Sequence, residues 1–213
     1  ARIAVLGPEE RWLAVGTASG AIDLWDLDQR AKPVLAKQLD SHREPITAIA
    51  FSDDGRYFAS GDRRGNIKIW DMRGTDAGNG LGELRAHKGE IDRLEFRDGG
   101  TRLFSFGGKQ VYAWDLQDGR RKGKEKLLAI GGDATAMAVN GEGDEVVVGD
   151  SIGQVLRWKV RTLATAQADA LAKHDGAVLD LAFIPKERAV LSLGSDNKLI
   201  VTELSQVMRE GSE

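Results

Sequence analysis

The sequence contains no cysteine, only four prolines and little excess of either charge, with 33 acidic against 30 basic residues in a total of 213. The absence of cysteine excludes disulfide bonds and thiolate metal sites. The formal net charge of −3 indicates no general attraction to nucleic acid or to an anionic membrane surface. Because no apolar run approaches the roughly 20 residues of a membrane-spanning helix, we expect a soluble, cytoplasmic protein.

Tryptophan, by contrast, recurs at a regular interval. Trp25, Trp70, Trp114 and Trp158 are separated by 45, 44 and 44 residues. The next interval ends at Thr202, within the segment LIVTEL, which keeps the same apolar pattern without an indole. Repeats of about 40–45 residues that end in Trp-Asp are typical of β-propeller blades, each of which has four strands. The 26 glycines agree with the many tight turns of such a fold.

The residues just before these five positions support the same repeat. In each repeat the residues three and one positions earlier are apolar, with Arg157 as the one exception. Residues two apart lie on the same face of a strand, so the pattern predicts a half-buried β-strand repeated five times rather than a helix. The ten positions are Ile22, Leu24, Ile67, Ile69, Val111, Ala113, Val155, Arg157, Leu199 and Val201.

All three histidines occupy one position of the repeat. His42, His87 and His174 precede Trp70, Trp114 and Thr202 by 28, 27 and 28 residues, whereas repeat four has Ile130 and Gly131 at this position. The sequence therefore predicts one structural position for the histidines, repeated in three blades.

On these motifs the chain resembles the WD-repeat (Trp-Asp) β-propeller family over essentially its whole length. The resemblance is carried by SHREPITAIAFSDDGRYFASGDRRGNIKIWD, AHKGEIDRLEFRDGGTRLFSFGGKQVYAWD and KHDGAVLDLAFIPKERAVLSLGSDNKLIVTE, in repeats two, three and five. It implies an all-β propeller of four-stranded antiparallel blades. We expect a single array of five blades at about residues 1–41, 42–86, 87–130, 131–173 and 174–213.

We name the four expected strands of each blade a, b, c and d in chain order, with d as the outer strand. The sequence supplies five sets of strands a, b and c but only four strands d. Repeat one reads RIAVL, WLAVG, AIDLW and PVLAKQL, whereas repeat five ends its pattern at LIVTEL. The outer strand of repeat four lies within TLATAQADALA, where the alanines also allow a helical turn. Since the family most often has seven blades, we expect an arc of a larger propeller, completed by further residues or by another chain. A closed ring of five blades is the alternative.

The resemblance implies a structural role for the histidines. In the family, the histidine of the d–a turn joins a serine or threonine of strand b, an aspartate of the b–c turn and the tryptophan of strand c in a buried hydrogen-bond chain. Because the three histidines of this sequence belong to separate blades, we expect no shared metal site.

No repeat carries all four members of that chain. Repeat two has His42, Ser60 and Trp70, with Arg64 where the aspartate would stand. Repeat three has His87 and Trp114, with Ser105 one place out of register. Repeat five has His174, Ser192 and Asp196, with Thr202 in place of the tryptophan.

Motifs of the common enzyme classes are absent. The sequence has no P-loop, no Gly-x-Ser-x-Gly elbow and no His-Glu-x-x-His metal helix. The acidic segment 141–145, GEGDE, falls at a predicted a–b turn and lacks the alternating spacing of calcium ligands. We therefore expect a non-catalytic protein without a cofactor or a metal site.

The loops are the remaining candidates for function. In a four-stranded meander the d–a and b–c turns emerge at one end of the blade, and in the family this end is the usual docking surface for a protein partner. Arg63 and Arg64, near Arg43 and Lys88, form a positive sector suited to an acidic peptide or a phosphate. The alternative is that these are solvated loop charges without a function. The full set of candidates is Arg43, Glu44, Arg63, Arg64, Lys88, Glu90, Lys109, Asp150 and Asp175.

A second basic group lies in a c–d turn, at the opposite end of the blades. It comprises Arg120, Arg121, Lys122, Lys124 and Lys126, without the interleaved aromatic residues of a single-strand nucleic-acid site. Two functional classes stay open. One is a protein-interaction scaffold or sensor, and the other is a polyanion or nucleic-acid binder that uses Arg63 and Arg64 or the run Arg120–Lys126. The alanine, glycine and arginine content favours a bacterial source.

Overall fold

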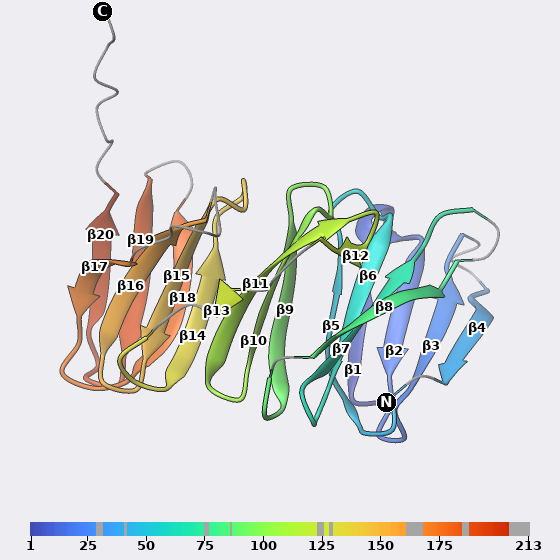
Figure 1. Ribbon diagram of the computed structural model, residues 1–213, viewed down its shortest axis with the longest axis horizontal. Helices are drawn as coiled ribbons and strands as arrows, with labels where there is room; N and C mark the ends of the chain where they lie inside the picture. Colours follow the sequence, from blue (N-terminus) through green and yellow to red (C-terminus); the bar gives the residue numbers. More distant parts are fainter. Residues whose placement is uncertain are drawn as a thin grey trace, which may run out of the picture. The chain divides into compact units, whose positions relative to one another are not determined.

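The computed structural model describes residues 1–28, 32–40, 42–74, 77–85, 87–122, 126–127, 130–160, 168–184 and 188–204. Their strands form five antiparallel sheets, each made from consecutive strands (Figure 1). The predicted fold class, an all-β chain of propeller-type blades, is confirmed. The chain divides into two compact units, Ala1–Leu128 and Ala129–Glu213. No helix within the described residues is both long and apolar enough to cross a membrane.

The first unit contains three sheets. Blade 1 consists of β1 (Ile3–Leu6), β2 (Trp12–Gly16), β3 (Ala21–Asp26) and β4 (Val34–Asp40), with a 3₁₀ turn, η1 (Pro8–Glu10), after β1. Blade 2 consists of β5 (Ile46–Phe51), β6 (Tyr57–Asp62), β7 (Asn66–Asp71) and β8 (Asn79–Arg85). Blade 3 consists of β9 (Ile91–Arg97), β10 (Arg102–Gly107) and β11 (Gln110–Gln117), and two short strands, β12 (Arg120–Arg121) and β13 (Lys126–Leu127), pair with β11.

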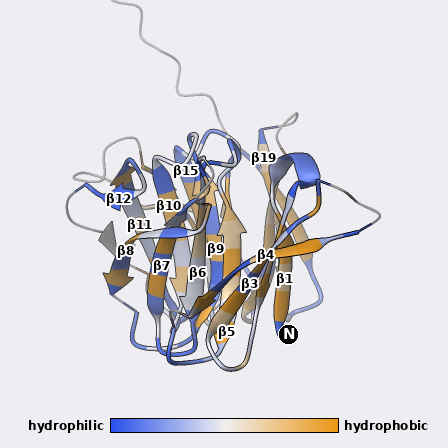
Figure 2. Cartoon of the chain, turned by 90° about the vertical axis from the view of Figure 1, so that its right-hand side faces the viewer, coloured by the Kyte–Doolittle hydropathy of each residue, from blue (hydrophilic) through white to orange (hydrophobic). Residues whose placement is uncertain are grey.

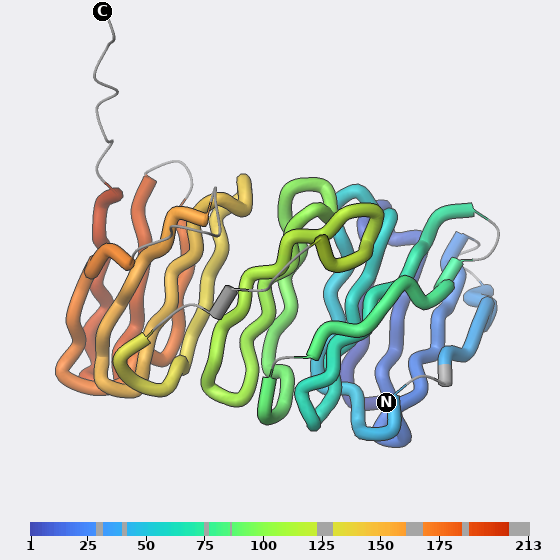
Figure 3. The backbone as a smooth tube through the Cα atoms, in the orientation of Figure 1, coloured from blue at the N-terminus to red at the C-terminus, as the bar shows by residue number. Residues whose placement is uncertain are grey.

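The second unit contains two sheets. Blade 4 consists of β14 (Ala134–Val139), β15 (Glu145–Asp150), β16 (Gln154–Lys159) and β17 (Ala168–Lys173). Blade 5 consists of β18 (Val178–Ile184), β19 (Ala189–Gly194) and β20 (Leu199–Glu203), and so has three strands within the described residues. Figure 3 follows the backbone of each unit from strand to strand without a crossover. The alanine-rich segment is a strand over 168–173, while residues 161–167 lie outside the described residues.

All strands of each sheet lie within one of the five predicted repeat ranges. That the five blades form a single array, as an arc or as a ring, stays a prediction.

Each sheet has two different faces, because side chains alternate along its strands. The indole face carries the tryptophan of strand c or its equivalent, Trp25, Trp70, Trp114, Trp158 or Thr202. The aliphatic face carries the residues three and one positions earlier. In three places the aliphatic face of one blade packs against the indole face of the next: blade 1 on blade 2, blade 2 on blade 3 and blade 4 on blade 5.

Glycines at the end of strand b allow this close packing of neighbouring sheets. A Cβ atom added to Gly61 would lie only 2.6 Å from the Cβ of Ile91, the first residue of β9 in the next blade. Any side chain there would push the two sheets apart. The same relation holds between Gly16 and Ile46, and between Gly149 and Val178.

Threonines of strand a add hydrogen bonds between neighbouring blades. Thr47 Oγ1 donates to the carbonyl oxygen of Ile91 at 2.7 Å, and Thr135 Oγ1 donates to that of Val178 at 2.6 Å. The two bonds occupy equivalent positions in blades 2 and 4, so they belong to the repeat rather than to one blade.

Arg157, the charged exception in the apolar pattern, is buried in β16. Its guanidinium donates to Asp169 Oδ2 at 2.8 Å and lies 3.7 Å from Glu145 Oε1. The two carboxylates offset the cost of burying the charge.

Candidate partner-binding face

The d–a and b–c turns of blades 2 and 3 contact one another through their backbones. The N–H of Arg63 donates to the carbonyl of Pro45 at 3.0 Å, which joins the b–c turn of blade 2 to the d–a turn before it. A Cβ on Gly65, where φ is +87°, would lie 2.7 Å from the carbonyl oxygens of His87 and Gly89 in the d–a turn of blade 3. These turns therefore form one continuous surface, the docking face, which carries Arg43, Glu44, Arg63, Arg64, Lys88, Glu90 and Lys109.

Asp62, the last residue of β6, shapes the b–c turn of blade 2. It is 1% exposed, and its Oδ1 accepts hydrogen bonds from the N–H groups of Arg64 at 2.9 Å and Asn66 at 3.0 Å. The side-chain amide of Asn66 donates to Oδ2 at 2.9 Å. An aspartate that binds the N–H groups that follow it stabilises a turn. Arg63 and Arg64 lie at the tip of this turn and are exposed.

Arg64 forms an ion pair on this surface. Its Nε lies 2.8 Å from Glu44 Oε1, and its side chain is 76% exposed. Arg64 stands four residues after Ser60, as Asp196 stands four residues after Ser192, but the expectation that blade 2 lacks the carboxylate of the chain is wrong. Asp62, the last residue of β6, supplies the carboxylate that hydrogen-bonds His42, whereas Arg64 lies in the turn beyond this strand and pairs with Glu44.

Three cations of the docking face are exposed and form no ion pair with any residue that the structure describes: Arg43, Arg63 and Lys88. Glu90, also exposed, follows Lys88 in the same turn. Burial raises the pKa of Asp92, and the charge of Glu90 raises it further, which places the carboxylate of Glu90 near that of Asp92. The docking face thus combines a positive sector with an acidic border.

Lys109 occupies the two-residue b–c turn of blade 3. Its backbone has a φ of +64°, and its side chain is exposed. The N–H of the preceding Gly108 donates to the carbonyl of Glu90 at 2.9 Å, so this turn is also tied to the d–a turn of its blade.

Two of the nine candidates belong to the second unit. Asp150 is only 1% exposed, so its prediction as a surface residue is wrong. Its carboxylate accepts the N–H of Gly132, which lies in the turn before β14, at 3.0 Å, and the N–H groups of Ile152 at 3.1 Å and Gln154 at 2.8 Å, which follow it in the chain. Asp175 is exposed and forms an ion pair with Lys198 Nζ at 2.6 Å.

Beneath the docking face, four side chains of blade 2 form a continuous hydrogen-bond chain. The indole N–H of Trp70 donates to Ser60 Oγ at 3.0 Å, and Ser60 Oγ lies 2.7 Å from His42 Nε2. His42 Nδ1 donates to Asp62 Oδ2 at 3.0 Å, which makes Nε2 the acceptor of the serine proton. Although burial alone would raise the pKa of Asp62, hydrogen bonds from Asn66 and His42 lower it.

Blade 3 forms the same chain with a backbone group in place of the aspartate. His87 Nδ1 donates to the carbonyl of Gly107 at 2.7 Å, so its Nε2 accepts from Ser105 Oγ at 2.7 Å. Trp114 Nε1 donates to the same hydroxyl at 2.8 Å. A carbonyl oxygen only accepts, so Nδ1 carries a proton, and burial favours the neutral form of the ring. Burial lowers the pKa of His87.

The sequence spacing predicted that Ser105 is one place out of register. In the sheet, however, Ser105 is in register. It pairs with Tyr112, two residues before Trp114, just as Ser60 pairs with Lys68, two residues before Trp70. The missing residue is removed from the b–c turn, which is Gly108–Lys109 in blade 3 and residues 63–65 in blade 2.

In blade 5, His174 Nε2 lies 2.9 Å from Ser192 Oγ, and its Nδ1 lies 3.1 Å from Asp196 Oδ1. Burial opposes ionisation of Asp196, but N–H donors from Asp175 and Lys198, together with His174, lower its pKa to about 2. Thr202 stands in the place of the tryptophan. The histidine chain therefore persists here without an indole.

The other candidate sites are less developed. Among the described residues, no three or more histidine, aspartate or glutamate side chains are grouped closely enough to hold a metal ion. Arg120 and Arg121 of the basic run form β12 and are exposed, as is Lys122. Lys124 and the side chain of Lys126 lie outside the described part of the chain.

The comparison with known families singles out one segment. Residues 33–71 match the family model described as WD domain, G-beta repeat. The matched segment contains β4 and the strands β5–β7 of blade 2, with the complete hydrogen-bond chain of that blade. No curated protein sequence matches the chain.

Solved structures match almost the whole chain. The β-propeller domain of Cps50 (Swd1) from Myceliophteria thermophila is 18% identical, with a TM-score of 0.73 over 99% of this chain and 67% of that one. The C-terminal WD40 domain of Sif2 is 19% identical, with a TM-score of 0.74 over 95% of this chain and 59% of that one. A chain of the Mitotic Checkpoint Complex is 20% identical, with a TM-score of 0.70 over 95% of this chain and 61% of that one. At these identities the likeness shows the fold, and the chain spans between 59% and 67% of the length of these structures.

Proposed function

In a chain that carries a WD repeat at residues 33–71 and folds into propeller-type blades, we propose that the docking face binds a protein partner. The protein is then a non-catalytic scaffold or sensor, and a cytoplasmic location belongs to the same proposal. Propeller structures similar in fold occur as parts of larger assemblies, as the Mitotic Checkpoint Complex illustrates.

The observation that supports this proposal best is the positive sector of the docking face. Arg43, Arg63 and Lys88 are exposed, and no described residue neutralises them. Their turns are held by buried bonds to Asp62 and His87, so the cations stand on a rigid backbone. Guanidinium groups bind carboxylates through two parallel hydrogen bonds, which favours an acidic segment of a protein as the partner. A rigid surface also loses little entropy on binding.

The test compares two pairs of exposed arginines. The variant R43E/R63E reverses two charges of the docking face, and R120E/R121E reverses two charges of β12 as the matched control. A fluorescent peptide that alternates glutamate and leucine serves as the acidic probe, with binding followed by anisotropy. We expect the affinity of R43E/R63E to fall at least tenfold and that of R120E/R121E to stay within about twofold of the parent. Equal losses in both variants, or a loss only in the control, contradict the proposal.

A salt titration separates this function from polyanion binding. The affinity for single-stranded DNA through phosphate contacts falls steeply with added salt, whereas a packed peptide contact responds less. Tighter binding to DNA than to the peptide, abolished by R120E/R121E, would favour the nucleic-acid alternative.

A further inference from the structure

The docking face carries unpaired charges of both signs. Arg43, Arg63 and Lys88 are exposed and form no ion pair with any described residue. Glu90 lies two residues after Lys88 and is exposed, and Asp92, the second residue of β9, is exposed as well. Neither carboxylate forms an ion pair within the part of the chain that the structure describes. Because charges across a protein interface are arranged to complement one another, both sets are candidates for contact with one partner.

Backbone contacts fix the order of these charges along the face. The N–H of Arg63 donates to the carbonyl of Pro45 at 3.0 Å, which joins the two turns of blade 2. The b–c turn of blade 2 then meets the d–a turn of blade 3, where a Cβ on Gly65 would lie 2.7 Å from the carbonyl oxygen of Gly89. Glu90 follows Gly89 directly. The docking face therefore passes from cations in blade 2 to carboxylates in blade 3.

The two carboxylates of blade 3 repel one another. The pKa of Asp92 is raised first by burial and then by the charge of Glu90, so the two groups are close enough to interact. The equivalent positions of blade 2 are occupied by Pro45 and Thr47, so this acidic pair is not part of the repeat. A cation supplied by a partner would favour the charged form of both carboxylates.

A contact with this surface depends on charge rather than on apolar burial. None of the exposed large apolar side chains of the described residues lies in the d–a or b–c turns of blades 2 and 3. Figure 2 shows hydrophilic stretches in the turns at the lower end of the sheets, beside the N-terminus, which is the end of the d–a and b–c turns. The pattern of signs on the face therefore selects the partner.

We propose that the docking face binds a protein segment that carries charges of both signs. Its carboxylates contact Arg43, Arg63 and Lys88, and a lysine or arginine beside them contacts Glu90. This proposal rests on the proposed function and specifies the chemistry of that partner. A nucleic acid offers no cation for Glu90, and its phosphates would lie against the carboxylates of blade 3. Because like charges placed opposite one another lower affinity, the face discriminates against such a polyanion.

The test compares three fluorescent peptides of equal length by anisotropy at low salt. One is the acidic peptide of alternating glutamate and leucine, and two mixed peptides carry lysine in place of its two glutamates at the N-terminal or the C-terminal end. We expect the parent protein to bind one mixed peptide at least about threefold more tightly than the acidic peptide, as one exposed ion pair allows. In Glu90→Lys this order reverses, because the new lysine repels the lysines of that mixed peptide and attracts the glutamates of the acidic one. Added salt weakens the preference.

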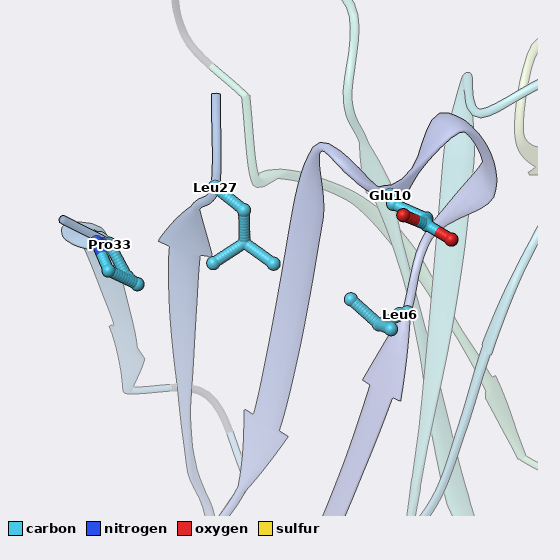
Figure 4. Close-up of a pocket in the computed structure, with 4 residues that line it drawn as sticks. All are labelled: Leu6, Glu10, Leu27 and Pro33. Carbon is cyan, nitrogen blue, oxygen red and sulfur yellow. The ribbon is translucent and has the colours of Figure 1, made fainter. Parts of the chain in front are cut away.

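Glu9→Lys is the matched control, because it makes the same change of charge outside the docking face. Glu9 is exposed in the a–b turn of blade 1. Its neighbour Glu10 lines a pocket at that end of the blade, which Figure 4 shows with Leu6, Leu27 and Pro33. The control variant keeps the order of affinities of the parent protein, and circular dichroism checks that both variants are folded.

The variant R43E/R63E separates this proposal from the proposed function. If it binds the acidic peptide as well as the parent protein does, the proposed function itself fails. If it loses that binding but the parent protein prefers the acidic peptide to both mixed peptides, only the proposal about Glu90 is overturned. A Glu90→Lys variant that keeps the order of affinities of the parent protein also overturns it, and so does tighter binding of single-stranded DNA than of either mixed peptide.

Discussion

His42 Nδ1 lies 3.0 Å from Asp62 Oδ2, between two side chains that are almost completely buried. The same histidine accepts a hydrogen bond from Ser60 in blade 2, and its backbone N–H donates to the carbonyl of Gly20 in blade 1 at 3.3 Å. His174 repeats the arrangement in the second unit, where its N–H donates to Gly153 of blade 4 at 2.9 Å. The histidine of the d–a turn therefore connects two neighbouring blades and supports the turn that carries the docking face.

Replacing His42 by alanine is expected to lower the free energy of unfolding by about 2 kcal/mol. The change leaves Ser60 without its acceptor and removes one donor from the buried carboxylate of Asp62, and unmade buried hydrogen bonds of this kind cost about 1–3 kcal/mol. Urea denaturation followed by tryptophan fluorescence measures the change. Arg43→Ala, at the exposed neighbouring position, serves as the control and should alter stability by less than about 0.5 kcal/mol. Equal effects of the two substitutions would show that the hydrogen-bond chain adds nothing.

Acid is expected to destabilise the fold below about pH 6.5. Burial lowers the pKa of both His42 and His87, although hydrogen bonds to Asp62 and to Gly107 oppose the shift. The unfolded chain, with a histidine pKa of about 6.5, then binds protons more readily than the folded chain, so stability is complete above that pH and declines below it. The slope is at most about 1.4 kcal/mol per pH unit for each histidine. Asp196, with its pKa lowered to about 2, adds a further loss between about pH 4 and pH 2.

Urea midpoints at pH 7.5, 6.0 and 5.0 measure the pH effect. The variant His87→Gln keeps a polar side chain in the blade 3 turn but cannot be protonated in this range. Its stability should depend less steeply on pH than that of the parent protein. Parallel profiles for the two proteins would show that protonation of His87 makes no contribution.

Gly61→Ala is expected to cost about 1–3 kcal/mol, because the new Cβ would meet the side chain of Ile91 at 2.6 Å and force neighbouring sheets apart. Gly82→Ala is the matched control in the same blade, since nothing lies within 4 Å of a Cβ at that position of β8. The control should be neutral or slightly stabilising, because alanine restricts the unfolded chain more than glycine does. Thermal unfolding of both variants provides the comparison. A tolerated alanine at 61 would mean that the blades are not closely packed there.

Much of the fold could be predicted from spacing. The tryptophan interval and the apolar positions before it identified strand c in every blade, and the three histidines identified the d–a turn. Differences between the b–c turns caused the errors in the site. Ser105 lies one residue closer to its tryptophan because the b–c turn of blade 3 is one residue shorter, and blade 2 carries its carboxylate at Asp62, two residues before Arg64. The Gly-Asp pair that ends strand b in both β6 and β15 was the available signal for Asp62 and Asp150.

The sequence by itself determined which residues alternate between two apolar faces and how often the pattern returns, because side-chain direction in a strand depends only on position along it. Only the tertiary structure decided which charges are buried, since that depends on where a turn directs its side chains. Asp150 and Arg64 have similar polarity in the sequence, yet one binds three backbone N–H groups in the interior and the other lies exposed beside Glu44. The exposure of Leu199 and Val201 likewise depends on the sheet next to them, because their pattern is the same as that of the buried Ile67 and Ile69.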